Sequence, residues 1–384
     1  MSSLTLRKFV MPEVVFGEGA RRQAVQYLDN LGVNHALLVT DPGVIASGWI
    51  AEIAAASEAE GIAVSIFSKI SENPRTNEVE SGAQVYRRND CNGILAIGGG
   101  SSMDCAKGIA ILSTNGGEIR NYEGVDQIPH MGPPLICIPT TAGSSADISQ
   151  FAVITDRNKK KKFGIISKTI IPDVSLVDPD MLSTLPRSYI AYCGFDALTH
   201  AIEAYVSTGS SHLTDLHALE AIRLIKDALP RVYKNKDDAE GTRFMALGSL
   251  HAGIAFSNAS LGLVHAMAHP LSGVYDLLHG EMNSLLLPHI IRYNFESSRS
   301  RYEQIAMTLG VPEDEISREG VEALINVLGE IAEDVGITGT LSDRGVMKRD
   351  IPTLADFAVV DGCIVTNPRL PTWEEVTQIY EKAL

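Results

Sequence analysis

Residues 93–104 read GILAIGGGSSMD, and this stretch indicates the kind of fold that the first half of the chain adopts. An apolar run typical of a buried strand leads into three glycines at 98–100, then into two serines and a helical pattern. Glycine lets backbone N–H groups approach a ligand closely, and the positive end of the following helix attracts an anion. We therefore expect a phosphate-binding corner, with Ser101 or Ser102 capping the helix. A Gly-rich connector that binds nothing is the equally simple alternative.

Strand and helix patterns alternate on both sides of this corner. We expect strands at 35–41, 62–68, 93–99 and 134–141, and helices at 19–32, 49–61, 77–90 and 101–113. Strands separated by helices of this length are typical of βαβ units and a mostly parallel sheet. The segment 151–167 interrupts the alternation, because two apolar runs flank a lysine-rich turn, and it predicts a β-hairpin.

The second half of the chain has a different character, with many helical periods and almost no strand pattern. Helices are expected at 196–207, 212–233, 244–259, 300–310, 320–336 and 373–384. The change falls near Pro186. The sequence therefore predicts an α/β, Rossmann-like dinucleotide-binding domain over residues 1–185 and an all-α domain over residues 186–384.

A second polar corner, IPTTAGSSAD at 138–147, follows the strand predicted at 134–141. Hydroxyls and a glycine lie there, as they do in the first corner. Two such corners at the ends of neighbouring strands favour an extended ligand such as a dinucleotide. Asp41 ends another strand, where an acid can hold an adenine-ribose diol. An Asp-Pro-Gly turn is the simpler interpretation of Asp41.

Two stretches of the second half carry side chains that bind metals. In CGFDALTHAIEAYVS at 193–207, Asp196 and His200 are four residues apart, so they project from one face of a helix. The stretch at 262–284 holds three histidines, His265, His269 and His279. One aspartate and two or three histidines could close around one divalent ion. Alternatively, each pair is an ordinary contact on a helix surface.

Composition excludes several classes of function. The chain has 384 residues, and 32 basic against 47 acidic residues give a net charge of −15, which disfavours nucleic acid and anionic membranes as partners. The five cysteines are scattered without a CxxC pair, a pattern of reduced, cytoplasmic proteins. We find no signal peptide and no apolar run of membrane-spanning length.

Taken together, these motifs resemble the iron-dependent (group III) alcohol dehydrogenases. The resemblance runs nearly end to end and is carried by VTDPG (39–43), ENPRT (72–76), GGGSSMDCAK (98–107), PTTAGSSAD (139–147), GFDALTHAIEAYVS (194–207), GLVHAMAHPL (262–271) and HG (279–280). It implies a dehydroquinate-synthase-like two-domain architecture, with the active site in the cleft between an N-terminal dinucleotide-binding domain and a helical domain.

The resemblance also assigns roles to residues. It implies that the metal ligands are Asp196, His200, His265 and His279. It implies that NAD is held by Asp41, Gly99, Gly100, Ser101, Thr140, Thr141 and Ser144, with Asn73, Asp104 and Lys162 nearby. It places His269 and Phe256 on the substrate side. The ligand set suits Fe(II), Zn(II), Mn(II) or Ni(II), and the resemblance favours iron.

The expected reaction is reversible hydride transfer between NAD(H) and a small primary alcohol or aldehyde. The alternatives are a non-redox metal- and NAD-dependent cyclase or lyase on the same fold, a polyol (glycerol-type) dehydrogenase, and a nucleotide-binding protein without catalysis. The chain departs from the family pattern in having TTAGSSAD for TTAGTGSE and HGEMNS for HGLANA, so that Glu281 closely follows His279. An edge strand within 8–16 could pair between subunits, so we expect a homodimer or a larger homo-oligomer.

Overall fold

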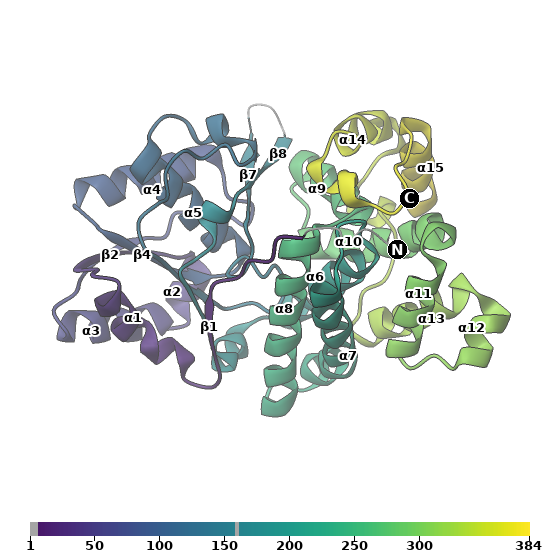
Figure 1. The fold of residues 1–384 in the computed structure, drawn as a ribbon, viewed down its shortest axis with the longest axis horizontal. Helices are drawn as coiled ribbons and strands as arrows, with labels where there is room; N and C mark the ends of the chain where they lie inside the picture. Colours follow the sequence, from purple (N-terminus) through teal and green to yellow (C-terminus); the bar gives the residue numbers. More distant parts are fainter. Residues whose placement is uncertain (1–6, 158–160) are drawn as a thin grey trace.

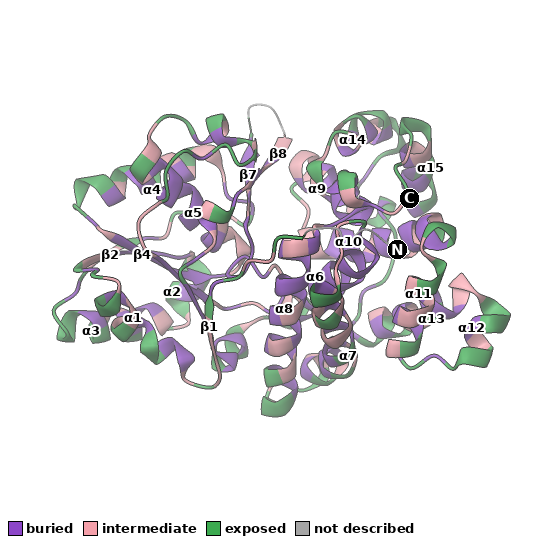
Figure 2. Ribbon diagram, in the orientation of Figure 1, coloured by how far each residue is buried: buried purple, intermediate pink, exposed green. Residues whose placement is uncertain are grey.

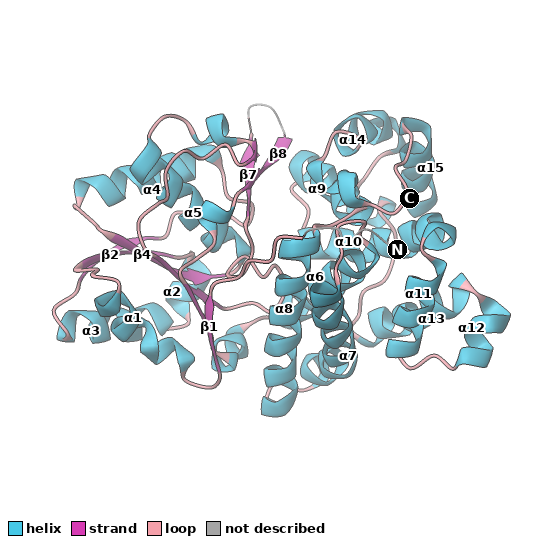
Figure 3. Ribbon diagram, in the orientation of Figure 1, coloured by secondary structure: helices cyan, strands magenta, loops and turns pink. Residues whose placement is uncertain are grey.

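The computed structural model describes residues 7–157 and 161–384. Figure 1 shows an α/β half and a helical half lying side by side, and Figure 3 shows the strands gathered in the first of these. The segment ahead of the first strand joins the two halves, because the backbone of Val10 exchanges hydrogen bonds with the side-chain amide of Asn258.

A six-stranded sheet forms the centre of the α/β half, as expected. It consists of β1 (Glu13–Phe16), β2 (His35–Val39), β3 (Ala63–Phe67), β4 (Gly93–Gly98), β6 (Leu135–Pro139) and β9 (Val174–Val177). The strand order is β1-β9-β6-β4-β2-β3, and every pair is parallel. Strand β9 was not predicted. It inserts between β1 and β6, and these neighbours supply the hydrogen bonds that define it.

Helices cover both faces of this sheet. They are α1 (Ala24–Asn30), α2 (Pro42–Ala46), α3 (Trp49–Ala59), α4 (Thr76–Arg88) and α5 (Gly100–Asn115). Successive side chains of a strand enter opposite core layers, with Leu37 in one and Leu38 in the other. Figure 2 shows the resulting buried interior. Burial on both faces explains why these strands are continuous apolar runs rather than alternating patterns.

A second, three-stranded sheet lies beside the first. It consists of β5 (Gly124–Val125), β7 (Phe151–Asp156) and β8 (Lys161–Ile166) in the order β5-β8-β7. Strands β7 and β8 are antiparallel, which confirms the hairpin predicted at 151–167. Residues 158–160 of its turn lie outside the described residues. This hairpin brings Phe151 and Lys162 to the boundary with the helical half.

After β9 the described residues form helices joined by loops, and no further strand follows. The α-helices of this second half are α6 (Arg187–Val206), α7 (His212–Lys234), α8 (Ala239–Ala259), α9 (Leu263–Tyr275), α10 (His279–Asn294), α11 (Arg299–Thr308), α12 (Glu313–Glu319), α13 (Val321–Asp334), α14 (Ile351–Ala358) and α15 (Trp373–Ala383). Helix α6 is buried along most of its length and packs against α7, α8 and α10. Helices α9, α10, α12 and α14 were missing from the predicted set.

Several of the helices are strongly apolar. Among the described residues, no single helix is long and apolar enough to cross a membrane, and only α8 and α9 pass such a test jointly, as a pair bent by 102°.

Candidate active site

A cleft of about 1010 Å³ lies between the carboxyl ends of the parallel strands and helices α6, α8, α9 and α10. Every residue for which the sequence predicts a cofactor, metal or substrate contact lines this cleft. They are Asp41, Asn73, Gly99, Gly100, Ser101, Asp104, Thr140, Thr141, Ser144, Lys162, Asp196, His200, Phe256, His265, His269 and His279. The structure thus brings the two predicted corners and the two histidine-bearing stretches to one cavity.

One end of the cleft holds a cluster of imidazoles around a carboxylate. Asp196 Oδ1 lies 3.7 Å from Nε2 of His200 and 3.7 Å from Nε2 of His265. His279 Nε2 lies 4.0 Å from the same oxygen. Donor atoms about 2.0–2.2 Å from a tetrahedral ion are roughly 3.4 Å apart, so the observed spacings are slightly expanded but compatible with one ion.

The four donors are not equally close to one another. The atoms of Asp196, His265 and His279 all lie within 4.8 Å of each other, whereas His200 is not part of that mutually close group. His200 approaches the carboxylate from the next turn of α6, and Phe256 of α8 stacks on its ring at 4.3 Å. Three candidate ligand atoms of the cluster therefore lie close together, and the fourth, from His200, lies beside them.

Asn283, which the sequence analysis did not single out, donates into the middle of this cluster. Its Nδ2 lies 2.7 Å from Asp196 Oδ1, 3.1 Å from His265 Nε2 and 3.2 Å from His279 Nε2. Its own Oδ1 is buried without a hydrogen-bond partner among the described residues. Three potential ligand atoms gathered around one amide group are what a buried cation site offers, so the residues present fit a divalent metal.

The charges of the cluster favour an ion as well. Burial opposes the charge on Asp196, yet the three surrounding imidazoles lower the pKa of its carboxyl. Burial lowers the pKa of His200 to about 4 and that of His279 well below its ordinary value, so both present neutral imidazole. For His265 burial also works against the charge, but Glu203 and Asp196 raise the pKa to about 9. A metal ion that binds here therefore displaces a proton from His265.

The other end of the cleft lies over the first predicted corner, where α5 begins. Its N-cap is Gly99, and no side chain caps the first turn. The expectation that Ser101 or Ser102 caps the helix is therefore wrong. Ser101 Oγ donates to the Glu72 carbonyl instead, and Ser102 Oγ donates to Asp41 Oδ2 at 3.2 Å. The helix N-terminus is left to face the cleft, as phosphate binding requires.

The second predicted corner touches the first. A Cβ at Gly100 would come within 2.8 Å of Ser144 Oγ, and one at Gly99 within 3.2 Å of Thr141 Cγ2. Glycine is needed at Gly100 because any side chain would meet Ser144. Thr140 joins the two corners through its backbone N–H, which donates to the Gly98 carbonyl.

Asp41 is held in place by its surroundings. Oδ1 accepts from the backbone N–H groups of Gly43 at 2.9 Å and Val44 at 3.1 Å, so this carboxylate caps the short helix α2. The turn interpretation and the ribose interpretation of Asp41 are therefore compatible, because a capping carboxylate that lines the cleft can still accept from a ligand.

Three further predicted cofactor contacts lie between the two ends of the cleft. Burial raises the pKa of Asp104 to about 6, and its Oδ2 accepts from the Val153 N–H at 3.1 Å. Desolvation lowers the pKa of Lys162 to about 8, and Asp104 partly opposes this effect. Asn73 lines the cleft, but its amide donates to Asp276 at 2.9 Å.

The chain is similar to known proteins over nearly its whole length. Residues 12–179 match the model of the iron-containing alcohol dehydrogenases, and residues 190–384 match the C-terminal domain of the Fe-containing alcohol dehydrogenase family. The chain is 39% identical to the lactaldehyde reductase of Escherichia coli K12, over 96% of this chain and 97% of that protein. It is 37% identical to the NAD-dependent methanol dehydrogenase of Bacillus methanolicus, over 98% and 99%.

A solved structure has the same fold over its whole length. The crystal structure of a 1,3-propanediol oxidoreductase superposes with a TM-score of 0.95 at 36% identity, covering 99% of this chain and 100% of that one. The chain belongs to the iron-containing alcohol dehydrogenase family. The expected family and the expected two-domain fold class are thereby confirmed.

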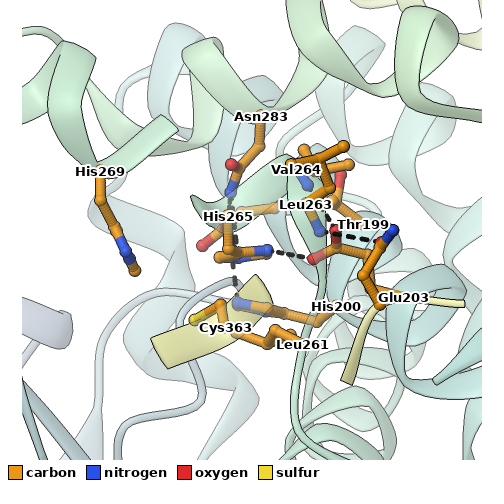
Figure 4. Close-up of polar contacts among 12 residues, drawn as sticks. Thr199, His200, Glu203, Leu261, Leu263, Val264, His265, His269, Asn283 and Cys363 are labelled. Carbon is orange, nitrogen blue, oxygen red and sulfur yellow. Dashed lines mark hydrogen bonds and ion pairs between the residues drawn. The ribbon is translucent and has the colours of Figure 1, made fainter. Parts of the chain in front are cut away.

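In this member of the iron-containing alcohol dehydrogenase family, Glu203 is a residue that the sequence analysis missed. Figure 4 shows it beside His265, and its Oε2 lies 2.6 Å from His265 Nδ1. Its other oxygen accepts from the Val264 N–H at 2.7 Å. A carboxylate on Nδ1 fixes the tautomer that leaves Nε2 as a donor to metal. Its position one helical turn from His200 is the only signal in the sequence.

His269 does not belong to the group of mutually close ligand atoms from Asp196, His265 and His279. Its Nδ1 is 2.8 Å from Asp361 Oδ2, and its ring stacks on that of His279 at 5.2 Å. Asp361 was also missed by the sequence analysis; it comes from the loop after α14, and its other oxygen accepts from the Cys363 N–H at 2.8 Å. The pair gives the cleft a histidine whose tautomer is set by a carboxylate.

Glu281, the residue that departs from the family pattern, does not contact the cluster. It is buried and accepts from Tyr192 Oη at 3.1 Å and from Arg344 Nε at 2.9 Å. Glu281 therefore ties the first turn of α10, which carries His279, to α6 and to the segment around Arg344.

Proposed function

We propose that this chain is an NAD-dependent alcohol dehydrogenase that transfers a hydride reversibly between NAD(H) and a small primary alcohol or aldehyde. The observation that carries the proposal is the arrangement of one cleft. One end holds a carboxylate and three histidines, and the other end holds an uncapped helix N-terminus between two corners rich in glycine and hydroxyls.

In this proposal Asp196, His200, His265 and His279 hold one Fe(II) ion, with Zn(II) as a possible substitute. Bound there, the ion supplies a Lewis acid that lowers the pKa of an alcohol oxygen or polarises a carbonyl. Glu203 holds His265 in the tautomer that the site needs. Three neutral imidazoles and a carboxylate do not distinguish strongly among divalent ions.

The cofactor end has its own set of residues. Gly99, Gly100 and Ser101 receive the pyrophosphate at the start of α5, while Thr140, Thr141 and Ser144 line the dinucleotide and Asn73, Asp104 and Lys162 lie close to it. Asp41 accepts from the adenine ribose and disfavours a 2′-phosphate, so we propose NAD rather than NADP.

His269 and Phe256 complete the proposed catalytic site. His269, oriented by Asp361, takes the proton that the alcohol releases and passes it to solvent. Phe256 packs flat on His200 and excludes water from that side of the cleft.

The alternative of a cyclase that acts on a phosphorylated acid needs a basic substrate pocket. Lys162 is the only lysine or arginine among the described residues that line this cleft. Because a single basic side chain would bind a phosphorylated acid poorly, the lining of the cleft supports the dehydrogenase proposal over the cyclase.

The test is an anaerobic rate measurement on protein loaded with Fe(II) or Zn(II). We expect NADH oxidation with short aldehydes and NAD⁺ reduction with the matching alcohols. Absence of turnover in both directions with every aldehyde and both metals would refute the proposal. His265→Ala should abolish turnover and metal retention together, and full metal content in that variant would exclude His265 as a ligand.

We also propose a domain boundary at 185/186, a cytoplasmic location and a homodimer or larger homo-oligomer. Limited proteolysis, cell fractionation and light scattering, respectively, test these three statements.

A further inference from the structure

The metal-binding end of the cleft has an apolar wall. Phe256 stacks on His200 at 4.3 Å between ring centroids, and Phe151 packs against Phe256 at 5.8 Å. Leu261 and Cys363 lie beside the same histidine in Figure 4, and both line the cleft. Because a buried thiol behaves as a small apolar group, this wall has the character of an alkyl-binding surface.

Phe151 is fixed in this wall by the strand that carries it. It is the first residue of β7, and its carbonyl accepts from Lys107 Nζ at 2.7 Å. Its neighbour Gln150 faces away from the cleft, where its amide donates to the Ser257 carbonyl and accepts from Lys8. The Gln150 amide is therefore unavailable to a substrate.

Two polar groups near the wall, Lys107 and His269, have partners within the protein. Lys107 donates to the carbonyl of Ser149 at 2.7 Å and to its hydroxyl oxygen at 3.3 Å. His269 Nδ1 is bonded to Asp361. In the proposed function the metal ligands and His269 act on the reacting oxygen. A second hydroxyl on a substrate whose carbon chain lies along this wall would face the side chains of Phe151, Phe256 and Leu261, which offer no hydrogen-bond partner.

We propose that Phe151 is a specificity-determining residue and that the preferred substrates are monohydric alkyl primary alcohols and their aldehydes, rather than diols and hydroxyaldehydes. This inference rests on the proposed function, whose chemistry it narrows. Burying a hydroxyl without a partner costs the hydrogen bonds that it made with water. An apolar pocket discriminates against an added hydroxyl by up to about a hundredfold.

The test compares substrates of nearly equal shape on the Fe(II)-loaded enzyme. One pair is 1-butanol and 1,3-propanediol, and the other is 2-methyl-1-propanol and 1,2-propanediol. In each pair a methyl group replaces a hydroxyl. We expect kcat/KM to be about 10- to 100-fold higher for the alkyl member of each pair. Ratios near one in both pairs would overturn the inference while leaving the proposed function intact.

Two variants locate the effect at Phe151. Phe151→Ser removes the ring and adds a hydroxyl, so the ratio should fall by about tenfold, chiefly through a gain on the diols. Phe151→Leu is the matched control, because it keeps an apolar side chain and should keep the wild-type ratio. If the ratio of kcat/KM between alkyl alcohol and diol were unchanged in folded Phe151→Ser, Phe151 would not determine specificity.

A binding measurement separates recognition from chemistry. Butyramide and 3-hydroxypropanamide resemble the two aldehydes but do not react, and their binding to the enzyme–NADH complex can be followed by NADH fluorescence. Butyramide should bind about tenfold more tightly or better. Equal affinities would refute the apolar wall. Absence of turnover with every alcohol would refute the proposed function instead. The two failures are distinguishable, because an enzyme that turns over both members of a pair equally is still active.

Discussion

Glu203→Gln offers a sharp test of how the metal site is built. The Glu203 carboxylate accepts two hydrogen bonds. Oε2 lies 2.6 Å from His265 Nδ1, and Oε1 accepts from the Val264 N–H at 2.7 Å. Glutamine has the same shape but only one acceptor oxygen. One of the two donors must then face an NH₂ group, and the negative charge that stabilises the His265 tautomer is lost.

The size of the effect follows from the burial of this pair. Glu203 and His265 are 5% and 1% exposed, so water cannot replace the lost acceptor. A hydrogen bond to a charged group contributes about 1.5–3 kcal/mol. Removing the carboxylate behind a ligating histidine typically weakens metal affinity by about 10- to 100-fold. That range corresponds to about 1.4–2.8 kcal/mol, which agrees with the estimate from the hydrogen bond.

The assay is anaerobic competition for Zn(II) or Fe(II) between the protein and a chromophoric chelator. We expect the Kd for the metal to rise by about 10- to 100-fold in Glu203→Gln. Asp147→Asn is the control, because Asp147 is another buried carboxylate, which accepts from Ser175 Oγ at 2.6 Å away from the histidine cluster. If folded Glu203→Gln held metal as tightly as the wild type and the control, Glu203 would not orient His265.

The side chains of His265, Asp41 and Asp361 can each be tested separately. In metal-free protein the raised pKa of His265, about 9 against 6.5, contributes stability that is complete below pH 6.5 and is lost as pH rises through about 9; urea unfolding at several pH values should show this loss, and a wild-type profile in Glu203→Gln would contradict it. Asp41→Asn keeps the helix cap but removes the charge, so the preference for NADH over NADPH in kcat/KM, about a hundredfold in the wild type, should narrow; an enzyme that already favours NADPH would disprove this role. Asp361→Asn should lower kcat by about a hundredfold with little change in the KM for NADH, because the amide can present N–H to His269 and favour the other tautomer; an unchanged kcat would exclude the relay.

The sheet illustrates what local sequence can specify. Strands β2, β3, β4 and β6 are apolar runs bounded by turn residues, and each lies within a residue or two of its predicted range. Strand β9 has only four residues, VSLV, with no alternation to mark it. It is a strand because β1 and β6 lie on either side of it, and that placement depends on the rest of the fold.

The helix caps show local preference yielding to tertiary contact. Serine after a glycine-rich loop is a favoured cap, which led to the prediction for Ser101 and Ser102. Both hydroxyls find partners from other segments instead, the Glu72 carbonyl and the Asp41 carboxylate. At Asp41 itself the local preference holds, because the N–H groups that it caps are two and three residues away in the chain.

The sequence by itself determined which residues carry chemistry when their relation is local. A spacing of four puts Asp196 and His200 on one face of α6, and consecutive glycines allow a close approach to the start of α5. Only the tertiary structure decided which distant groups meet them. Glu203 reaches His265 across 62 residues, Asp361 reaches His269 across 92, and Asn283 of α10 reaches Asp196 on α6 and His265 on α9. Such contacts leave no periodic trace in the chain, because they depend on how the helices pack and not on the conformation of any one of them.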